Sequence, residues 1–125
     1  MMSFLLVALG GAIGAAGRYG VSLAMPMRPD GWPWATFGIN VLGSLMIGVL
    51  SGWLAAREGA GEAWRLFLGV GVAGGFTTFS AYSLETLALI GRGAWLGAFV
   101  YALGSVAAGL AAAAAGAWIA RGMAA

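Results

Sequence analysis

The residues of this chain that could do chemistry are a few polar side chains set into long apolar stretches. Arg18 and Glu85 are the two charges inside these stretches, and Asn40 and Tyr101 add an amide and a phenol. Hydroxyl and amide groups donate hydrogen bonds, and an aromatic ring presents a positive edge, so these groups and an arginine suit an anion. Carbonyls that lose their helical partners are acceptors and suit a hard cation such as Na⁺. These side chains as a set are better suited to bind an anion, and the freed carbonyls could hold a buried cation with a structural role.

These four residues, one in each apolar stretch, lie at a similar depth. At about 1.5 Å per residue, each is about 8–10 Å from the end of its stretch on one common side. Helical spacing of four adds hydroxyls on the same faces: Thr36 and Ser44 join Asn40, and Ser105 joins Tyr101. Polar groups at such depth usually face a bundle interior or an aqueous cavity. The pattern predicts the lining of a pathway.

Each polar residue also has a purely structural interpretation, and the sequence leaves both open. Arg18 and Glu85 could form an ion pair; otherwise the arginine serves something anionic, because it costs about 2.5–3.5 kcal/mol to insert. Asn40 could make an interhelical hydrogen bond. Ser and Thr hydroxyls in membrane helices often bond to their own backbone, and Phe79 alone would be ordinary packing. Only the layer as a whole favours a function.

The segment 71–82 (GVAGGFTTFSAY) is the least helix-like part of the chain. Glycine costs about 1 kcal/mol relative to alanine in a helix interior, and β-branched threonines add to this cost. We expect the helix to break here, near mid-membrane, with the pair Gly74 and Gly75 opening it. Such a break leaves carbonyls without helical partners, which a membrane tolerates only where they are buried in protein, line a cavity or bind an ion.

Four long apolar stretches must position these residues. The chain has 125 residues, of which 62% are hydrophobic and 8% charged, whereas a water-facing domain carries about a quarter charged residues. Each stretch is long enough to cross a membrane. We predict an all-α integral membrane protein, with a single membrane domain over 1–125 and helices at about 3–25, 33–56, 64–90 and 94–120. The connections are predicted at 25–31, 57–62 and 91–93.

Small residues recur at a spacing of four within the predicted helices. This spacing lets helix backbones approach closely in lipid, so it predicts tight packing and oligomerisation. The residues concerned are Gly10 and Gly14, then Ser44, Gly48 and Gly52, then Gly71 and Gly75.

Four crossings place both termini on one side of the membrane. That side carries Arg57, Arg65 and Arg121, and the other carries Arg28 and Arg92. Because an excess of basic residues in cytoplasmic loops normally sets orientation, three against two gives almost no bias. Either the side with the termini is cytoplasmic, or the chain inserts both ways and pairs head-to-tail as an antiparallel homodimer.

The composition excludes several classes of protein. Without cysteine or histidine, the chain has no disulfide, no thiol nucleophile, no imidazole metal ligand and no histidine for acid–base catalysis or a Ser–His protease, so we expect no enzyme. A net charge of +2 is too small to indicate the basic surface that binds nucleic acid.

Two other membrane functions are alternatives. A small multidrug-type exporter would need an embedded carboxylate in helix 1, where this chain has Arg18. A packing subunit would not explain the polar layer.

Three motifs resemble those of a known family. Residues 10–19 (GGAIGAAGRY) resemble its GGxxGAxxRY signature, residues 36–44 (TFGINVLGS) its TxxxNxxGS helix, and residues 74–82 (GGFTTFSAY) its GGxTTFSTF segment. On these motifs the chain is identified as a member of the Fluc-type (CrcB) family of fluoride channels. The third motif is the most specific. The resemblance implies a passive, fluoride-selective channel of the inner (plasma) membrane that exports fluoride from the cytoplasm and confers fluoride resistance.

The resemblance also implies an assembly and a set of site residues. It implies an antiparallel, dual-topology homodimer with two fluoride pores, and a structural Na⁺ at the two-fold axis held by the backbone carbonyls of Gly74 and Thr77. Arg18 would attract anions at the vestibule, where Glu85 is also placed. The implied pore residues are Phe79, Tyr82, Asn40, Ser80, Tyr101, Ser105 and Thr36.

Three positions depart from the family pattern. The second phenylalanine of the family's ring pair is Tyr82 here, and the threonine before it is Ala81. A tyrosine keeps the positive ring edge but adds a hydroxyl, which must find a partner or a wetter position. Gly109 continues the spacing of Tyr101 and Ser105 without a hydroxyl.

Overall fold

The computed structural model describes residues 1–57 and 61–124, and these residues contain no strand. Four helical spans are long and apolar enough to cross a membrane: Met2–Ala24, Trp34–Ala55, Glu62–Gly91 and Trp95–Met123. The predicted all-α membrane fold with four transmembrane helices is therefore confirmed. Of the predicted 57–62 connection, residues 58–60 lie outside the described part of the chain.

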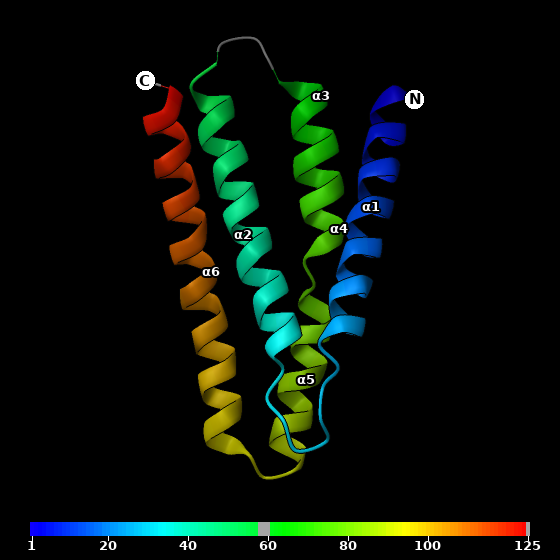
Figure 1. Ribbon diagram of the computed structural model, residues 1–125, viewed down its shortest axis with the longest axis vertical. Coiled ribbons are helices and arrows are strands. Elements are labelled where there is room, and N and C mark those ends of the chain that lie inside the picture. Colours follow the sequence, from blue (N-terminus) through cyan, green and yellow to red (C-terminus); the bar gives the residue numbers. More distant parts are fainter. Residues whose placement is uncertain (58–60, 125) are drawn as a thin grey trace.

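The four spans lie side by side along their length, with the N- and C-termini at the same end (Figure 1). Three of them are single helices: α1 (Met2–Ala24), α2 (Trp34–Ala55) and α6 (Trp95–Ala124). The third span is composite and consists of α3 (Glu62–Trp64), the π-helix η1 (Arg65–Ala73), α4 (Gly74–Phe76) and α5 (Phe79–Gly91). The predicted interruption of the third helix is thus present, and it lies between α4 and α5.

The helices α2 and α6 run in the same direction and pack closely because α2 carries glycines at their contact (Figure 1). A Cβ atom on Gly48 would overlap the carbonyl of Ala113, and one on Gly52 would overlap the carbonyl of Ala117. Backbone thus lies directly against backbone, which is the association that small residues at a spacing of four predict.

The helix α1 packs on the first half of the third span in the same way. A Cβ on Gly10 would overlap the Phe67 carbonyl, and one on Gly14 would overlap the Val72 carbonyl. These contacts fix α1, and therefore Arg18, against the part of the chain that leads into the break. The glycine spacing predicted for helix 1 is thus confirmed as a packing face.

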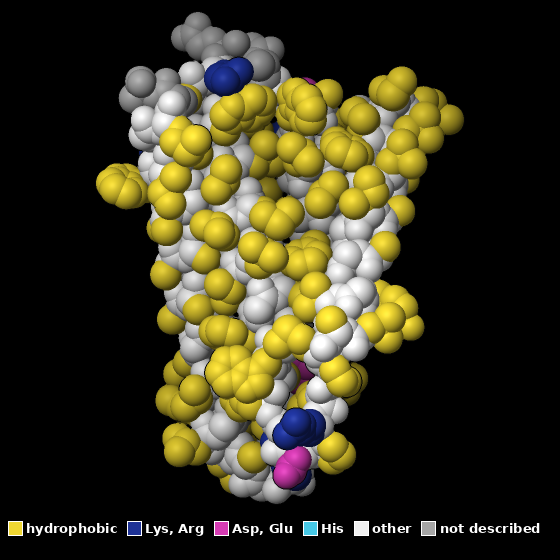
Figure 2. Space-filling view, viewed as in Figure 1, with side chains coloured by type: hydrophobic (Ala, Val, Ile, Leu, Met, Phe, Trp, Pro, Cys, Tyr) yellow, Lys and Arg dark blue, Asp and Glu magenta, His cyan; other side chains and the backbone are white. Residues whose placement is uncertain are grey.

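The surface is apolar over most of its length. Hydrophobic side chains cover the body of the face seen in Figure 2, and basic side chains gather near its two ends. A small core lies at the end opposite the termini, where Leu89, Ala98 and Tyr101 are buried. There Arg92 donates to the carbonyls of Pro29 (2.7 Å) and Gly31 (2.6 Å), so the two connections at this end are tied together.

Candidate functional site: the break in the third span

The third span breaks at two consecutive threonines. Thr77 (φ −77°, ψ 158°) and Thr78 (φ −149°, ψ 121°) have extended backbones between α4 and α5. The glycine pair does not open the helix as expected, because Gly74 is helical (φ −63°, ψ −40°) and α4 contains both glycines. Gly75 instead allows a close approach, since a Cβ there would lie 2.5 Å from the Gly11 carbonyl. The extended conformation falls on the β-branched residues, which prefer it.

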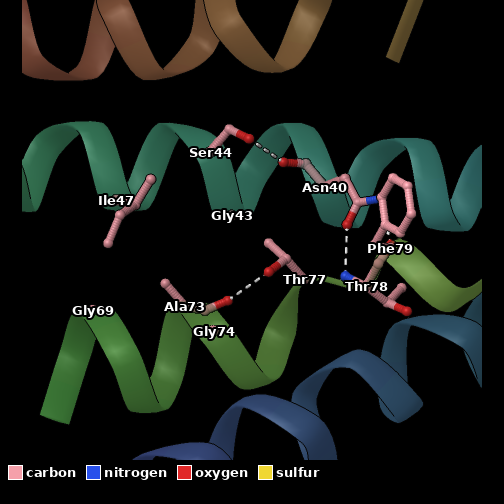
Figure 3. Close-up of a pocket in the computed structure, with 10 residues that line it drawn as sticks. All are labelled: Asn40, Gly43, Ser44, Ile47, Gly69, Ala73, Gly74, Thr77, Thr78 and Phe79. Carbon is pink, nitrogen blue, oxygen red and sulfur yellow. Dashed lines mark hydrogen bonds between the residues drawn. The ribbon is translucent and has the colours of Figure 1, made fainter. Parts of the chain in front are cut away.

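Asn40 of α2 holds the break with both ends of its side-chain amide (Figure 3). Its Oδ1 accepts the Thr78 N–H at 2.8 Å, and its Nδ2 donates to the Thr78 carbonyl at 3.0 Å. This is the interhelical hydrogen bond that the sequence left open, and it is made to an interrupted backbone. The Thr78 N–H would otherwise be the partner of the Gly74 carbonyl, four residues earlier.

A second side chain, that of Thr78, accepts a backbone N–H at the start of α5. The Thr78 hydroxyl accepts the Ala81 N–H at 3.1 Å and so caps α5. In a continuous α-helix the Ala81 N–H would bond to the Thr77 carbonyl. Asn40 and Thr78 therefore divert the amides that would have occupied the carbonyls of Gly74 and Thr77.

A cavity of about 350 Å³ opens beside the break, between α2 and the third span (Figure 3). Phe79 lines it and is 79% exposed, and Gly74, Thr77 and Asn40 also line it. Gly43 of α2 makes room for Thr77, because a Cβ there would overlap the threonine methyl. The cavity is thus lined by the two residues whose carbonyls lack helical amides, Gly74 and Thr77, and by the Asn40 amide and the Phe79 ring.

A second polar cluster surrounds Glu85, nearer the end of the molecule opposite the termini. The Thr36 hydroxyl donates to Oε1 of Glu85 at 2.8 Å, and the Tyr101 hydroxyl donates to Oε2 at 2.9 Å. Thr36 and Tyr101 are both buried. A carboxylate inside a membrane span needs such donors, and here each oxygen has one.

Arg18 does not pair with Glu85. Its Nε donates to the Gly75 carbonyl at 3.3 Å, two residues before the break. Among residues 1–57 and 61–124, the ion pair within 4.0 Å is the exposed Arg65–Glu62 contact. The ion-pair alternative for these two residues is therefore wrong, and Arg18 attaches α1 to the third span instead.

Aromatic rings connect the two polar clusters. Tyr82 lies between Phe79 and Tyr101, with ring centroids 5.5 Å and 5.3 Å apart. The extra hydroxyl of Tyr82 has the partner that the sequence required, because it donates to the Ala102 carbonyl of α6 at 2.8 Å. The rings therefore run from the break to the Glu85 cluster.

The serines have different environments. Ser105 Oγ is buried without a hydrogen-bond partner in the described structure, whereas Ser44 donates back to the Asn40 carbonyl at 2.7 Å. Ser80 is exposed, with its hydroxyl 3.2 Å from that of Thr78. Among the described residues, Ser105 Oγ is thus the buried side-chain polar atom that has no hydrogen-bond partner.

Comparison with known proteins identifies the family of this chain. The family described as "CrcB-like protein, Camphor Resistance (CrcB)" matches residues 5–117, which include all three motifs. The chain belongs to the CrcB family. Its relatives include proteins named "Fluoride-specific ion channel FluC" from Hyphomonas neptunium (54% identical over 123 residues) and Phenylobacterium zucineum (55% over 124), with 97% of each chain covered. A relative of the same name from Novosphingobium aromaticivorans is 56% identical over 115 residues, covering 88% of this chain and 89% of the relative.

In this CrcB chain the predicted site residues form two groups joined by rings. The break gathers Asn40, Gly74, Thr77, Phe79 and Ser80, with Arg18 beside it through Gly75. The second group holds Thr36, Glu85, Tyr101 and Tyr82.

Thr78 is a site residue that the sequence did not predict. Its hydroxyl accepts the Ala81 N–H at the start of α5, and its own backbone N–H donates to Asn40. Two signals for it were present in the sequence. Consecutive β-branched residues disfavour a helix. Threonine is also a common N-cap residue, because its hydroxyl can accept the N–H of the third residue of the helix that follows. Together they locate the break one turn later than the glycine pair does.

Proposed function

We propose that this CrcB chain is a passive, selective channel for fluoride, which exports the anion from the cytoplasm and so confers fluoride resistance. The observation that carries the proposal is that relatives matching 97% of the chain are named fluoride-specific channels. The chemistry of the site agrees, because hydroxyls, an amide and ring edges offer hydrogen-bond donors and positive edges to an anion. The family's function is transport, so an enzyme is not proposed.

The fluoride path would run along the rings between the two polar groups. Phe79 would offer its ring edge at the open cavity, and Tyr82 and Tyr101 continue the row of rings. The buried Ser105 hydroxyl, which has no partner among the residues that the structure describes, is suited to donate to a passing anion. Small anions lose strongly bound water on entering such a path, so donors must replace it. Asn40, Ser80 and Thr36 complete the set of pore residues, and Arg18 and Glu85 belong to the vestibule.

The carbonyls of Gly74 and Thr77 would hold the structural Na⁺. They fit a hard cation because the N–H groups that a continuous helix would give them are bonded to Asn40 Oδ1 and Thr78 Oγ1. Na⁺ would supply a positive charge at mid-membrane that keeps these carbonyls together. Two carbonyls are too few oxygens for such an ion, which favours a site shared by two copies of the chain.

An antiparallel, dual-topology homodimer in the inner (plasma) membrane would complete the site. The cavity at the break is open in the single chain, and Phe79 is 79% exposed beside it. A second copy would cover this opening and bring its own Gly74 and Thr77 to the two-fold axis. The arginines, split three to two between the two sides, permit both insertions.

The channel needs no energy source other than the acid outside the cell. Neutral HF crosses the membrane and dissociates in the cytoplasm, and the anion then leaves through the pore. No titrating side chain is needed for this transport, which agrees with a chain that lacks histidine.

Two substitutions test whether the break forms the pore. Asn40→Asp removes the amide donor and Phe79→Ile removes the ring edge, so each is expected to abolish fluoride efflux from proteoliposomes. Size-exclusion chromatography should still show the wild-type assembly for Phe79→Ile. Unchanged efflux in both variants would contradict the assignment of this region to the pore.

A further inference from the structure

Tyr82 is held at both ends. Its Cβ belongs to α5, and its hydroxyl donates to the Ala102 carbonyl of α6 at 2.8 Å, twenty residues away in the chain. Ala102 lies well inside α6 (Trp95–Ala124), so this acceptor is a fixed group of a continuous helix. The ring therefore cannot swing about its Cα–Cβ bond unless this hydrogen bond opens.

The neighbouring rings confine Tyr82 further. Phe79 lies 5.5 Å from it, Tyr101 lies 5.3 Å from it, and Trp32 meets Tyr101 edge-on at 5.1 Å. Trp32 is itself attached to α6, because its Nε1 donates to the Gly97 carbonyl at 3.3 Å. Three of the four rings in this row, those of Tyr82, Tyr101 and Trp32, are thus fixed by polar atoms, whereas Phe79 has none and is exposed.

The hydroxyl of Tyr82 is not available as a ligand. A phenol has one proton to donate, and here that proton is used in the contact between α5 and α6. The Tyr101 hydroxyl differs, because its acceptor is the Glu85 carboxylate, a side chain that can rotate away. What Tyr82 can offer to an anion is therefore its ring edge in a fixed orientation.

We propose that Tyr82 is a positioning residue of the anion path, whose hydroxyl bond to the Ala102 carbonyl fixes the ring and limits how fast the anion passes it. The inference rests on the proposed function, in which fluoride moves along the row of rings. In this inference the ion displaces the ring as it passes, and the anchored ring moves only when its hydrogen bond to Ala102 opens. Phenylalanine, which the family motif has at this position, lacks this anchor.

The first test compares fluoride efflux from proteoliposomes containing the full chain and its Tyr82→Phe variant. Opening one neutral hydrogen bond corresponds to a rate factor of about two- to tenfold, so Tyr82→Phe should raise the fluoride turnover by that factor. The matched control is Tyr19→Phe, because Tyr19 is 65% exposed on α1, away from the ring row, and this variant should conduct like the wild type. A Tyr82→Phe turnover equal to or below that of the wild type would overturn the inference.

A second measurement needs no variant at position 82. The chain has three tyrosines, so ring Cζ labelling gives three NMR signals, which Tyr19→Phe and Tyr101→Phe assign by elimination. The Cζ shift reports what the phenol donates to, and the Tyr82 signal should not move when fluoride is added. A fluoride-dependent shift of that signal would make the hydroxyl a ligand and overturn the inference. If the wild type carries no fluoride at all, it is the proposed function that fails.

Discussion

The side-chain amide of Asn40 bonds to both backbone groups of Thr78, at 2.8 Å to its N–H and 3.0 Å to its carbonyl. This one contact replaces the helical hydrogen bonding that the break removes from Thr78. It also leaves the Gly74 carbonyl without its helical amide. The same contact therefore stabilises an interrupted helix inside a membrane and exposes an acceptor beside the cavity.

Asn40→Asp should destabilise the protein. Aspartate can still accept the Thr78 N–H, but it places a carboxylate against the Thr78 carbonyl and leaves that acceptor without a donor. A buried group left unsatisfied costs about 1–3 kcal/mol. Thermal unfolding in detergent should therefore occur at a lower temperature than for the wild type. Ser22→Ala is the control, since its exposed hydroxyl donates to the Arg18 carbonyl of its own helix. Equal unfolding temperatures for Asn40→Asp and the wild type would show that this contact does not hold the break.

Na⁺ should stabilise the folded assembly. If the carbonyls of Gly74 and Thr77 bind Na⁺ in the native state only, a concentration one hundred times the dissociation constant adds about 2.7 kcal/mol of stability. The midpoint of thermal unfolding should rise with NaCl and stay lower in N-methylglucamine chloride of the same ionic strength. Identical midpoints in the two salts would argue against a sodium site at the break.

Arg18 and Glu85 should be energetically independent. Arg18 donates to the Gly75 carbonyl, and Glu85 accepts from Thr36 and Tyr101, so the two share no contact. In a double-mutant cycle of Arg18→Gln and Glu85→Gln, the coupling energy should be below about 0.5 kcal/mol. Each single substitution should still lower the unfolding temperature. A coupling of several kcal/mol would restore the ion pair.

Gly48→Val should disrupt the packing of α2 on α6. Any Cβ at this position overlaps the Ala113 carbonyl, which belongs to a helix backbone and cannot move aside easily. We expect a large loss of folded protein after purification. Gly38→Ala on the same helix is the control, because a Cβ at Gly38 meets nothing within 4 Å and alanine favours the helix by about 1 kcal/mol. Similar yields from both variants would contradict the α2–α6 contact.

Much of the fold could be predicted from the sequence because the membrane leaves few alternatives. Length and hydropathy alone define the four spans, and glycines at a spacing of four mark the faces on which α1 and α2 pack. The polar residues themselves could also be identified, since helical spacing puts Thr36 and Asn40 on one face of α2. The sequence predicts one layer, however, and the structure divides it into two groups, with Thr36 at Glu85 and Asn40 at Thr78.

The partners of individual side chains were harder to predict. Counting from the helix ends predicts a similar depth for Arg18 and Glu85, and this prediction was wrong. Arg18 bonds to Gly75 beside the break, whereas Glu85 lies ten residues further along the third span with Thr36 and Tyr101. The position of the break depended on Thr78, whose two hydrogen bonds come from a different helix and from its own side chain. The anchor of Tyr82 on Ala102 requires the relative placement of α5 and α6, which no local pattern contains.

Whether this chain is a fluoride channel is decided by efflux of fluoride from proteoliposomes that contain the purified wild-type chain, with chloride as the comparison anion. With valinomycin present to carry the compensating K⁺ current, a fluoride electrode should record rapid fluoride release, and a chloride electrode should show that chloride stays inside. Equal rates for the two halides would make the protein a generic anion pore, and retention of both would contradict a channel.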